Sequence, residues 1–196
     1  MENIINRVKN VLFCPKTEWQ AIEAENAPHA NVFTSYVVPL ALIPAVASFI
    51  GYGLIGYSVF GVHVGGTVSW GLRQAIVQYI AMLGGTYITA FVIDALAANF
   101  GATKDFNRAF SLVAYSYTPM FVAGVFYILP SLSWLASLAG LYGLYLLYIG
   151  LQPMMKAPEE KQTGYFVVSL VVTILVSVVV SFILGAILLR GTRLGF

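Results

Sequence analysis

The chain contains few charged residues. Asp, Glu, Lys and Arg make up 9% of its 196 residues, whereas a soluble domain carries about a quarter. Hydrophobic residues make up 59%, and the mean hydropathy is +0.84. This composition argues against a soluble domain and favours a membrane protein. The net charge is only +2 and the basic residues are dispersed, so we expect no nucleic-acid partner.

Residues that carry enzyme chemistry are also scarce. Cys14 is the only cysteine, which excludes an intrachain disulfide and a cysteine-based metal cluster. We expect it to be a small buried residue, with lipid modification as the alternative. Neither histidine, His29 or His63, lies in a predicted span or has metal-ligand spacing around it. No GxSxG, P-loop or dinucleotide fingerprint occurs, so we expect no catalytic residue, no metal, no cofactor and no enzyme activity.

Five long apolar segments dominate the chain, and each is long enough to cross the roughly 30 Å hydrocarbon layer as a helix. Their predicted bounds are Val32–Leu54, Gln74–Ala98, Phe110–Leu129, Leu132–Leu151 and Tyr165–Leu189. The last is rich in valine, but in lipid only a helix satisfies its own backbone. The sequence predicts an all-α, polytopic membrane helical bundle with five transmembrane helices over residues 32–196, after a short amphipathic amino-terminal arm over residues 1–31.

The predicted arm begins with a helix over Met1–Phe13. Apolar side chains recur there at helical spacing, and we assign the charged ones, Arg7 included, to the opposite face. Such a helix lies in the headgroup layer. We expect Pro15 to end it, and Thr17 and Gln20 to form a capping box that starts a second helix. We interpret the arm as a surface anchor, with a partner-binding role as the alternative.

The segment between the first two spans is apolar but rich in glycine. Val62–Val64 and Thr67–Ser69 alternate in polarity around Gly65-Gly66, a pair that suits a tight turn. The pattern predicts a short β-hairpin that turns at these glycines, or an ordered lid, on the outer face. His63 within it is expected to be a surface residue.

Small residues in two spans predict close helix packing. Gly84-Gly85 lies near the middle of the second span, and Gly140 and Gly143 each follow an alanine by four residues in the fourth. Membrane helices gain packing energy where small residues let backbones approach. We therefore expect a neighbouring helix to approach closely at both places.

Asp94 is the only acidic residue inside a predicted span. A charge at mid-bilayer costs roughly 2.5 to 3.5 kcal/mol on insertion scales, and less near the interface. We expect an ion pair with Lys104 or Arg108 across the following turn. A proton or cation site is the alternative.

The third span contains Tyr115-Ser116-Tyr117-Thr118-Pro119 near its centre. Pro119 breaks the backbone hydrogen-bond ladder, and the neighbouring hydroxyls are placed to satisfy the freed carbonyls. In the fourth span, Tyr145 belongs to a row of tyrosines beside the small residues. The two helices could line a polar crevice, but we favour a packing seam. The candidate functional polar residues are Asp94, Arg108, Tyr115, Tyr117, Pro119 and Tyr145.

The distribution of positive charge predicts the orientation. Seven Lys and Arg residues flank the spans on the side of the amino terminus, and three lie on the other side. By the positive-inside rule, the amino terminus is predicted to be cytoplasmic and the carboxyl terminus outside.

Several short motifs, in order along nearly the whole chain, resemble the bacterial branch of the Yip family. They are Asn6–Leu12, Pro15 with Glu18-Trp19, Phe100-Gly101, Tyr115–Pro119 and Leu144–Leu151. The resemblance implies a five-helix membrane domain with a cytoplasmic amino terminus, and its bacterial branch indicates the cytoplasmic membrane. It implies no substrate and no catalytic residue.

Eukaryotic Yip proteins associate with Rab-type GTPases and with one another. The segment before the first span here lacks their acidic-aromatic signature, so we do not expect GTPase binding. The hypothesis we favour is a non-enzymatic scaffold that organises the membrane through helix packing, with lipids, further copies of itself or other membrane proteins as partners. The alternative is a small transporter or channel with a polar pathway near Asp94 and the broken third helix.

Overall fold

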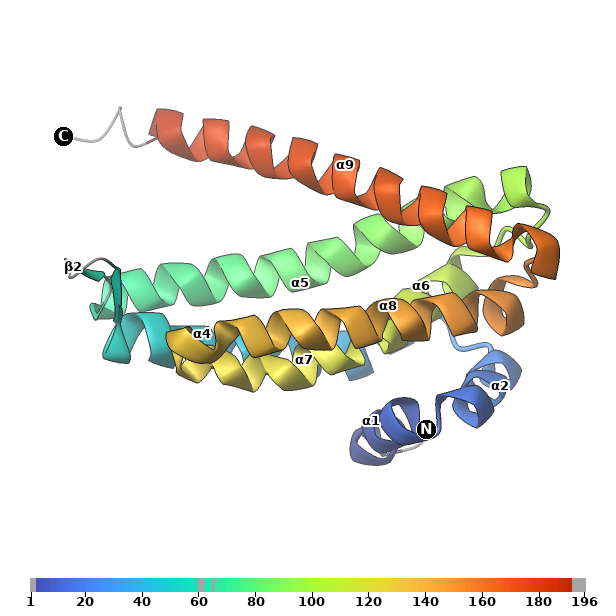
Figure 1. The fold of residues 1–196 in the computed structure, drawn as a ribbon, viewed down its shortest axis with the longest axis horizontal. Coiled ribbons are helices and arrows are strands. Elements are labelled where there is room, and N and C mark those ends of the chain that lie inside the picture. Colours follow the sequence, from blue (N-terminus) through green and yellow to red (C-terminus); the bar gives the residue numbers. More distant parts are fainter. Residues whose placement is uncertain (1–2, 60–61, 65, 192–196) are drawn as a thin grey trace.

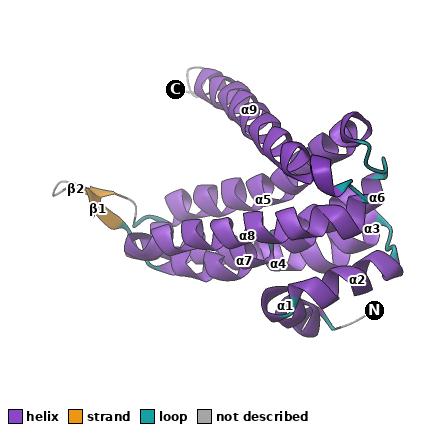
Figure 2. Ribbon diagram, turned by 45° about the vertical axis from the view of Figure 1, so that its right-hand side comes forward, coloured by secondary structure: helices purple, strands orange, loops and turns teal. Residues whose placement is uncertain are grey.

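Helices form nearly all of the computed structural model, with one small strand pair at one end (Figure 2). The structure describes the backbone of residues 3–59, 62–64 and 66–191, and the side chains of residues 3–56 and 66–179. Five helical segments of the described chain are long and apolar enough to cross a membrane. The predicted all-α membrane bundle is confirmed.

Each span except the last is built from more than one helical element. The first comprises α3 (His29–Val32), η1 (Phe33–Val37), α4 (Val38–Ser48) and η2 (Phe49–Ile55). The second comprises α5 (Val68–Ala97) and η3 (Ala98–Phe100), and the third α6 (Phe106–Ser116), α7 (Thr118–Ala123) and η4 (Gly124–Ile128). The fourth comprises η5 (Pro130–Leu132) and α8 (Ser133–Met155), and the fifth is α9 (Glu159–Gly191).

The second span begins at Val68, six residues before the predicted start at Gln74. The reason is a helix cap. The side chain of Thr67 accepts a hydrogen bond from the backbone N–H of Trp70, which satisfies one of the free donors at the start of α5.

The third span is the centre of the bundle. In its most apolar stretch 72% of the residues are buried, against 17% in the last span. Figure 1 shows why: α4, α5, α7 and α8 run alongside one another, whereas α9 diverges from α5 toward the carboxyl terminus. Gly124 of the third span lies so close to Pro44 that a Cβ at Gly124 would come within 2.5 Å of the proline ring. The first and third spans are therefore in intimate contact.

The β-hairpin exists, but its turn is not where the sequence predicts it. Strands β1 (Tyr57–Val59) and β2 (Val62–Val64) pair antiparallel, so the hairpin turns before Gly65-Gly66. Gly66 has a φ of +75° and its N–H donates to the carbonyl of Tyr52 at 3.0 Å. This glycine uses its conformational freedom to lead the chain into α5. The side chain of His63 lies outside the described residues.

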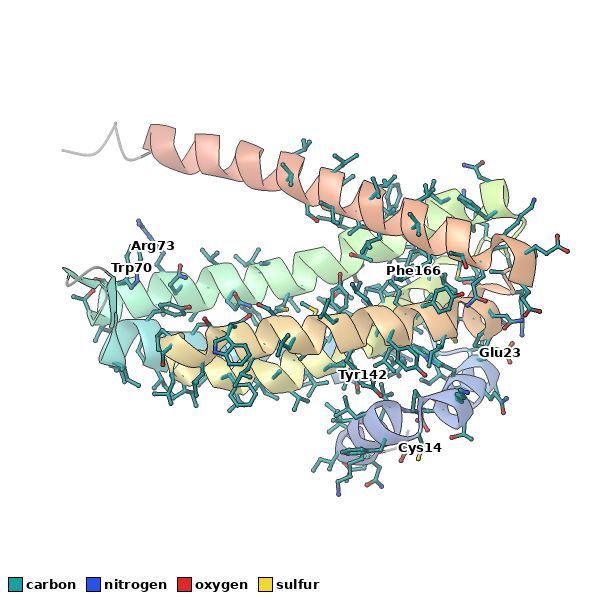
Figure 3. All side chains as sticks on the ribbon, viewed as in Figure 1. Cys14, Glu23, Trp70, Arg73, Tyr142 and Phe166 are labelled. Atoms are coloured by element: carbon teal, nitrogen blue, oxygen red, sulfur yellow. The ribbon has the colours of Figure 1, made fainter. Side chains whose placement is uncertain are left out.

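The amino-terminal arm consists of α1 (Ile4–Phe13) and α2 (Pro15–Glu25). The predicted capping box is wrong, because α2 starts at Pro15, a residue suited to the first helical position. The Thr17 hydroxyl instead donates to the carbonyl of Cys14 at 3.0 Å. The prediction that Cys14 is buried is also wrong: its side chain is exposed at the junction of the two helices (Figure 3).

The two predicted small-residue contacts have different outcomes. Gly143 of α8 lies against the third span, where a Cβ would come within 2.8 Å of the Ser116 carbonyl oxygen, so this prediction is confirmed. A Cβ at Gly84 or Gly85 would meet no atom of the described residues within 4 Å, so no helix in that part of the chain provides the expected close approach there.

Candidate functional site

The most elaborate polar cluster lies where α1 docks on the third span, and Arg7 is its centre. The Arg7 side chain is only 5% exposed. One guanidinium nitrogen, Nη1, donates to Glu18 Oε1 at 2.5 Å, and Nη2 donates to Glu25. Its Cζ also lies 5.6 Å from the centre of the Tyr115 ring, a cation–π distance. We call Arg7, Glu18, Glu25 and Tyr115 the arm-docking cluster.

The charge of Arg7 is stabilised by its neighbours. Burial alone favours the neutral form, but the hydrogen bond to Glu25 and the attraction of the surrounding groups outweigh it and raise the pKa of Arg7. The sequence analysis placed Arg7 on the polar face of the first helix, and that was wrong. Arg7 is three residues after Ile4 and four before Val11, so it lies within the apolar stripe.

A hydroxyl network connects this cluster to the break in the third helix. The Thr118 hydroxyl donates to the Tyr115 carbonyl at 2.6 Å, which is the carbonyl that Pro119 deprives of its helical partner. Because that hydroxyl has a single hydrogen, the Tyr36 hydroxyl must donate to Thr118 Oγ1, 2.7 Å away. The expected repair of the broken ladder is confirmed, and Tyr36 is a participant that the sequence analysis missed.

Apolar and backbone contacts complete the docking of the arm. Trp19 of α2 is 2% exposed, and its ring lies against Gly150, where a Cβ would come within 2.7 Å of the indole. The Tyr142 hydroxyl of α8 donates to the carbonyl of Leu12 at 2.7 Å (Figure 3). The arm therefore packs against the bundle, in addition to lying at the edge of the bundle.

A second ion cluster closes the end of the arm. Glu23 Oε1 lies 2.8 Å from Lys156 Nζ and 3.0 Å from Arg108 Nη1. Hydrogen bonds from Lys156 and Arg108 lower the pKa of Glu23 below its usual value. Arg108 Nε also lies 3.6 Å from Asp105 Oδ2. These contacts join the arm to the first turn of the third span and to the loop before the fifth.

Asp94 does not form the predicted ion pair. Arg108 pairs with Glu23 and Asp105, and among the described residues no basic group forms a salt bridge with Asp94. Its Oδ1 atom is buried without a hydrogen-bond partner. Within the part of the chain that the structure describes, no group of His, Cys, Asp or Glu could hold a metal ion.

The predicted polar residues do not converge on one site. Tyr115 belongs to the arm-docking cluster, and Pro119 lies at the helix break beside it. The Tyr117 hydroxyl instead bonds the Thr89 hydroxyl at 2.8 Å. Tyr145 is 45% exposed and stacks on Tyr142 with ring centres 5.8 Å apart. Tyr115 and Pro119 thus share one neighbourhood, whereas Tyr117 and Tyr145 lie in two others.

A pocket of about 470 Å³ lies near the β-hairpin, far from the arm. We call it the hairpin-end pocket. Its lining contains no charged residue and consists of Ser48, Tyr52, Gln74, Gln78, Tyr127, Ser133, Trp134 and Ser137. The sequence analysis missed it, although Gln74 with Gln78 and Ser133 with Ser137 are polar pairs four residues apart within apolar spans.

Comparison with known proteins decides the family. The model of the Yip1 domain matches residues 9–182, most of the chain. The chain belongs to the Yip1 domain family. This Yip1 chain is 32% identical over 125 residues to the inner membrane protein YohC of Escherichia coli strain K12, and equally to that of strain O6:H1 CFT073. The match covers 63% of this Yip1 chain and 63% of each relative's length. No solved structure matches it.

The family predicted from the motifs is thereby confirmed. The name of the relatives and the five apolar helices identify this Yip1 chain as an integral membrane protein of bacterial type. The side on which each terminus lies stays a prediction.

Proposed function

We propose that this Yip1 protein is a non-enzymatic membrane scaffold that associates with a second copy of itself through α5. The observation that carries the proposal is the uncovered face of α5 around Gly84. Small residues in a membrane helix favour close helix contact, and here none of the residues that the structure describes provides that contact.

The uncovered face has the spacing of a helix-pairing seam. Val77, Ala81, Gly84, Ile88 and Phe91 follow one another at intervals of four and three residues. Val77 is 49% exposed and Phe91 65%. Alternate intervals of four and three keep a seam on one side of two helices that cross at a small angle. We call these five residues the α5 seam.

A second copy fits the α5 seam better than a charged or polar partner does. The seam has no ionisable group, so it can face its own copy without repulsion. Gly84 lies near the middle of the 30-residue helix, where a two-fold axis normal to the membrane would bring two copies together in the same orientation. Lipid chains and other membrane proteins remain further proposed partners of the exposed helices.

The proposed orientation keeps the predicted one, with the arm and its ion clusters in the cytoplasm. The excess of lysine and arginine on that side of the spans supports it. The arm would then lie at the inner surface, with the exposed Phe13 available to the headgroup layer.

A transporter or channel is the second candidate, and Asp94 is the observation in its favour. An unpaired buried carboxylate oxygen within a span is the kind of group that marks ion and proton pathways. The hairpin-end pocket gives this candidate no support, since its deepest α5 residue, Gln78, lies sixteen residues from Asp94, roughly 24 Å along the helix. Proton and cation flux in proteoliposomes that is lost in Asp94→Asn would support transport.

Cysteine crosslinking in membranes tests the scaffold proposal. In a Cys14→Ser background, Ala81→Cys places a thiol on the α5 seam, and Val46→Cys places one on α4, on a lipid-facing site that is 54% exposed. We expect oxidation to crosslink the Ala81→Cys protein to dimer and to leave the Val46→Cys protein monomeric.

A bulky residue on the α5 seam provides the second part of the test. A Cβ at Gly84 would meet no described atom within 4 Å, so the fold should persist in Gly84→Leu while dimer formation at Ala81→Cys falls several-fold. Equal crosslinking at positions 46 and 81, or crosslinking that is insensitive to Gly84→Leu, would refute the proposal.

A further inference from the structure

The hairpin-end pocket is a concave polar site that opens at the surface of an apolar bundle. Its about 470 Å³ fall in the range of small-molecule binding pockets. Two elements face each other across it: α5 provides Gln74 and Gln78, and α8 provides Ser133 and Ser137. In each pair the residues are four apart and so share one face of their helix.

The polar groups of the pocket have unused hydrogen-bonding capacity. Ser133 Oγ donates to the carbonyl of Pro130 at 2.8 Å. Among the described residues, no hydrogen bond is made by the side-chain amides of Gln74 and Gln78 or by the hydroxyl of Ser137. Each amide has two donors and one acceptor. Gln74 and Gln78 are half-buried and Ser137 is exposed, so an occupant of the pocket can reach all three groups. The site can therefore hold a polar group through several hydrogen bonds.

The lining also defines the chemistry of the occupant. The absence of any charged lining residue disfavours an ion or an anionic headgroup. Hydroxyls and amides can both donate and accept, which matches a group with many hydroxyls. Trp134, 57% exposed, adds a flat aromatic surface on which the C–H face of a sugar ring can pack.

The depth of the pocket suits a headgroup. Gln74 and Gln78 lie six and ten residues after the start of α5, about 9 and 15 Å along the helix. The 33-residue span Val68–Phe100 is about 50 Å long and extends about 10 Å beyond a hydrocarbon layer of about 30 Å at each end. Gln74 therefore lies at the border between headgroups and hydrocarbon, and Gln78 lies about 5 Å inside the hydrocarbon.

We propose that the hairpin-end pocket binds an uncharged polyhydroxylated group: the sugar headgroup of a glycolipid, or a free saccharide. The amides of Gln74 and Gln78 hydrogen-bond its hydroxyls, and Trp134 packs against the ring. This binding does not depend on pairing through the α5 seam.

The test uses the full chain in nanodiscs. Phosphatidylcholine discs contain either monoglucosyldiacylglycerol or phosphatidylserine, and native mass spectrometry measures which lipid the released protein retains. In a third experiment, free glucose is added to protein in discs of phosphatidylcholine alone, and tryptophan fluorescence is measured. We expect roughly tenfold enrichment of the glycolipid over both phospholipids, the effect of about two well-placed hydrogen bonds. A glucose response without glycolipid enrichment would also support the proposal and identify a free saccharide as the source.

Variants show whether the pocket is responsible. The double variant Gln74→Leu/Gln78→Leu should reduce enrichment, or the glucose response, roughly tenfold. Trp134→Ala alters only the exposed rim and should weaken binding too, whereas Gln152→Leu, at the other end of α8, should change nothing. No enrichment and no glucose response, or equal binding by wild type and both pocket variants, would overturn the proposal.

Discussion

Replacing Arg7 with methionine should undock the amino-terminal arm. Arg7 and Glu18 are a buried pair, with side chains 5% and 9% exposed. Methionine fills much of the space of the arginine stem but leaves the Glu18 carboxylate buried without its partner. Removing one member of a buried ion pair costs about 3–5 kcal/mol. The half-exposed Glu25 adds little, because solvent screens its contact with Arg7.

The expected cost falls on docking rather than on the whole bundle. The arm contacts the membrane domain through its own helices, and the five spans are stabilised separately by lipid and by their packing. A loss of about 3–5 kcal/mol raises the population of the undocked arm by roughly two to four powers of ten. Amide hydrogen exchange in nanodiscs measures it, because the protection of α1 and α2 should fall by that factor while the protection of α6 is unchanged.

Two further variants make this prediction refutable. Lys9 lies on the same helix but is exposed, so Lys9→Met should leave exchange in the arm unaltered. Replacing both buried partners, as Arg7→Met with Glu18→Leu, removes the uncompensated charge and should restore much of the lost protection. Unchanged protection in Arg7→Met, or a double variant as labile as the single one, would refute the reasoning.

Three other predictions concern the arm and the third span. The pKa of Glu23 is lowered in the docked arm, so the contribution of Glu23 to docking is present above the usual glutamate pKa of 4.5. This contribution is lost as the pH falls through the lowered pKa. Glu23→Gln should therefore remove the part of the acid sensitivity of amide hydrogen exchange in α2 that Glu23 causes. Thr118→Val deprives the Tyr115 carbonyl and the Tyr36 hydroxyl of a partner and should lower unfolding stability by about 1–3 kcal/mol, whereas Thr118→Ser should not. Gly143→Val forces a methyl-bearing carbon toward a backbone carbonyl 2.8 Å away and should cost about 1–3 kcal/mol in the same unfolding assay, a prediction that equal stability would contradict.

The large-scale architecture was predictable because lipid imposes a simple requirement. A segment without charge and of sufficient length must be a helix there, so the five spans follow from hydropathy alone. The ends of the helices were less predictable, since they depend on single capping residues such as Thr67 and on Pro15 at a helix start. A glycine pair indicates conformational freedom without saying which turn uses it, and Gly66 leads into α5 instead of closing the hairpin.

The polar sites depend on contacts between distant segments, which sequence spacing does not specify. Asp94 was assigned a partner by proximity in the chain, yet Arg108 is occupied by Glu23, 85 residues away. Small-residue spacing predicted close approach at both Gly143 and Gly84, but only tertiary structure shows that the second is left open. One signal was available and missed: a cation within an apolar stripe, as at Arg7, indicates a buried partner.

The central claim is that the α5 seam of one copy meets that of another in the membrane. The most direct measurement is the distance between spin labels at Ile80, which is 59% exposed and flanks the seam without belonging to it. In bilayers and in a Cys14→Ser background, paired helices with axes about 8–10 Å apart should give a narrow distribution of label distances below roughly 30 Å, and Gly84→Leu should abolish it. A signal containing only the background of randomly distributed monomers would contradict the account.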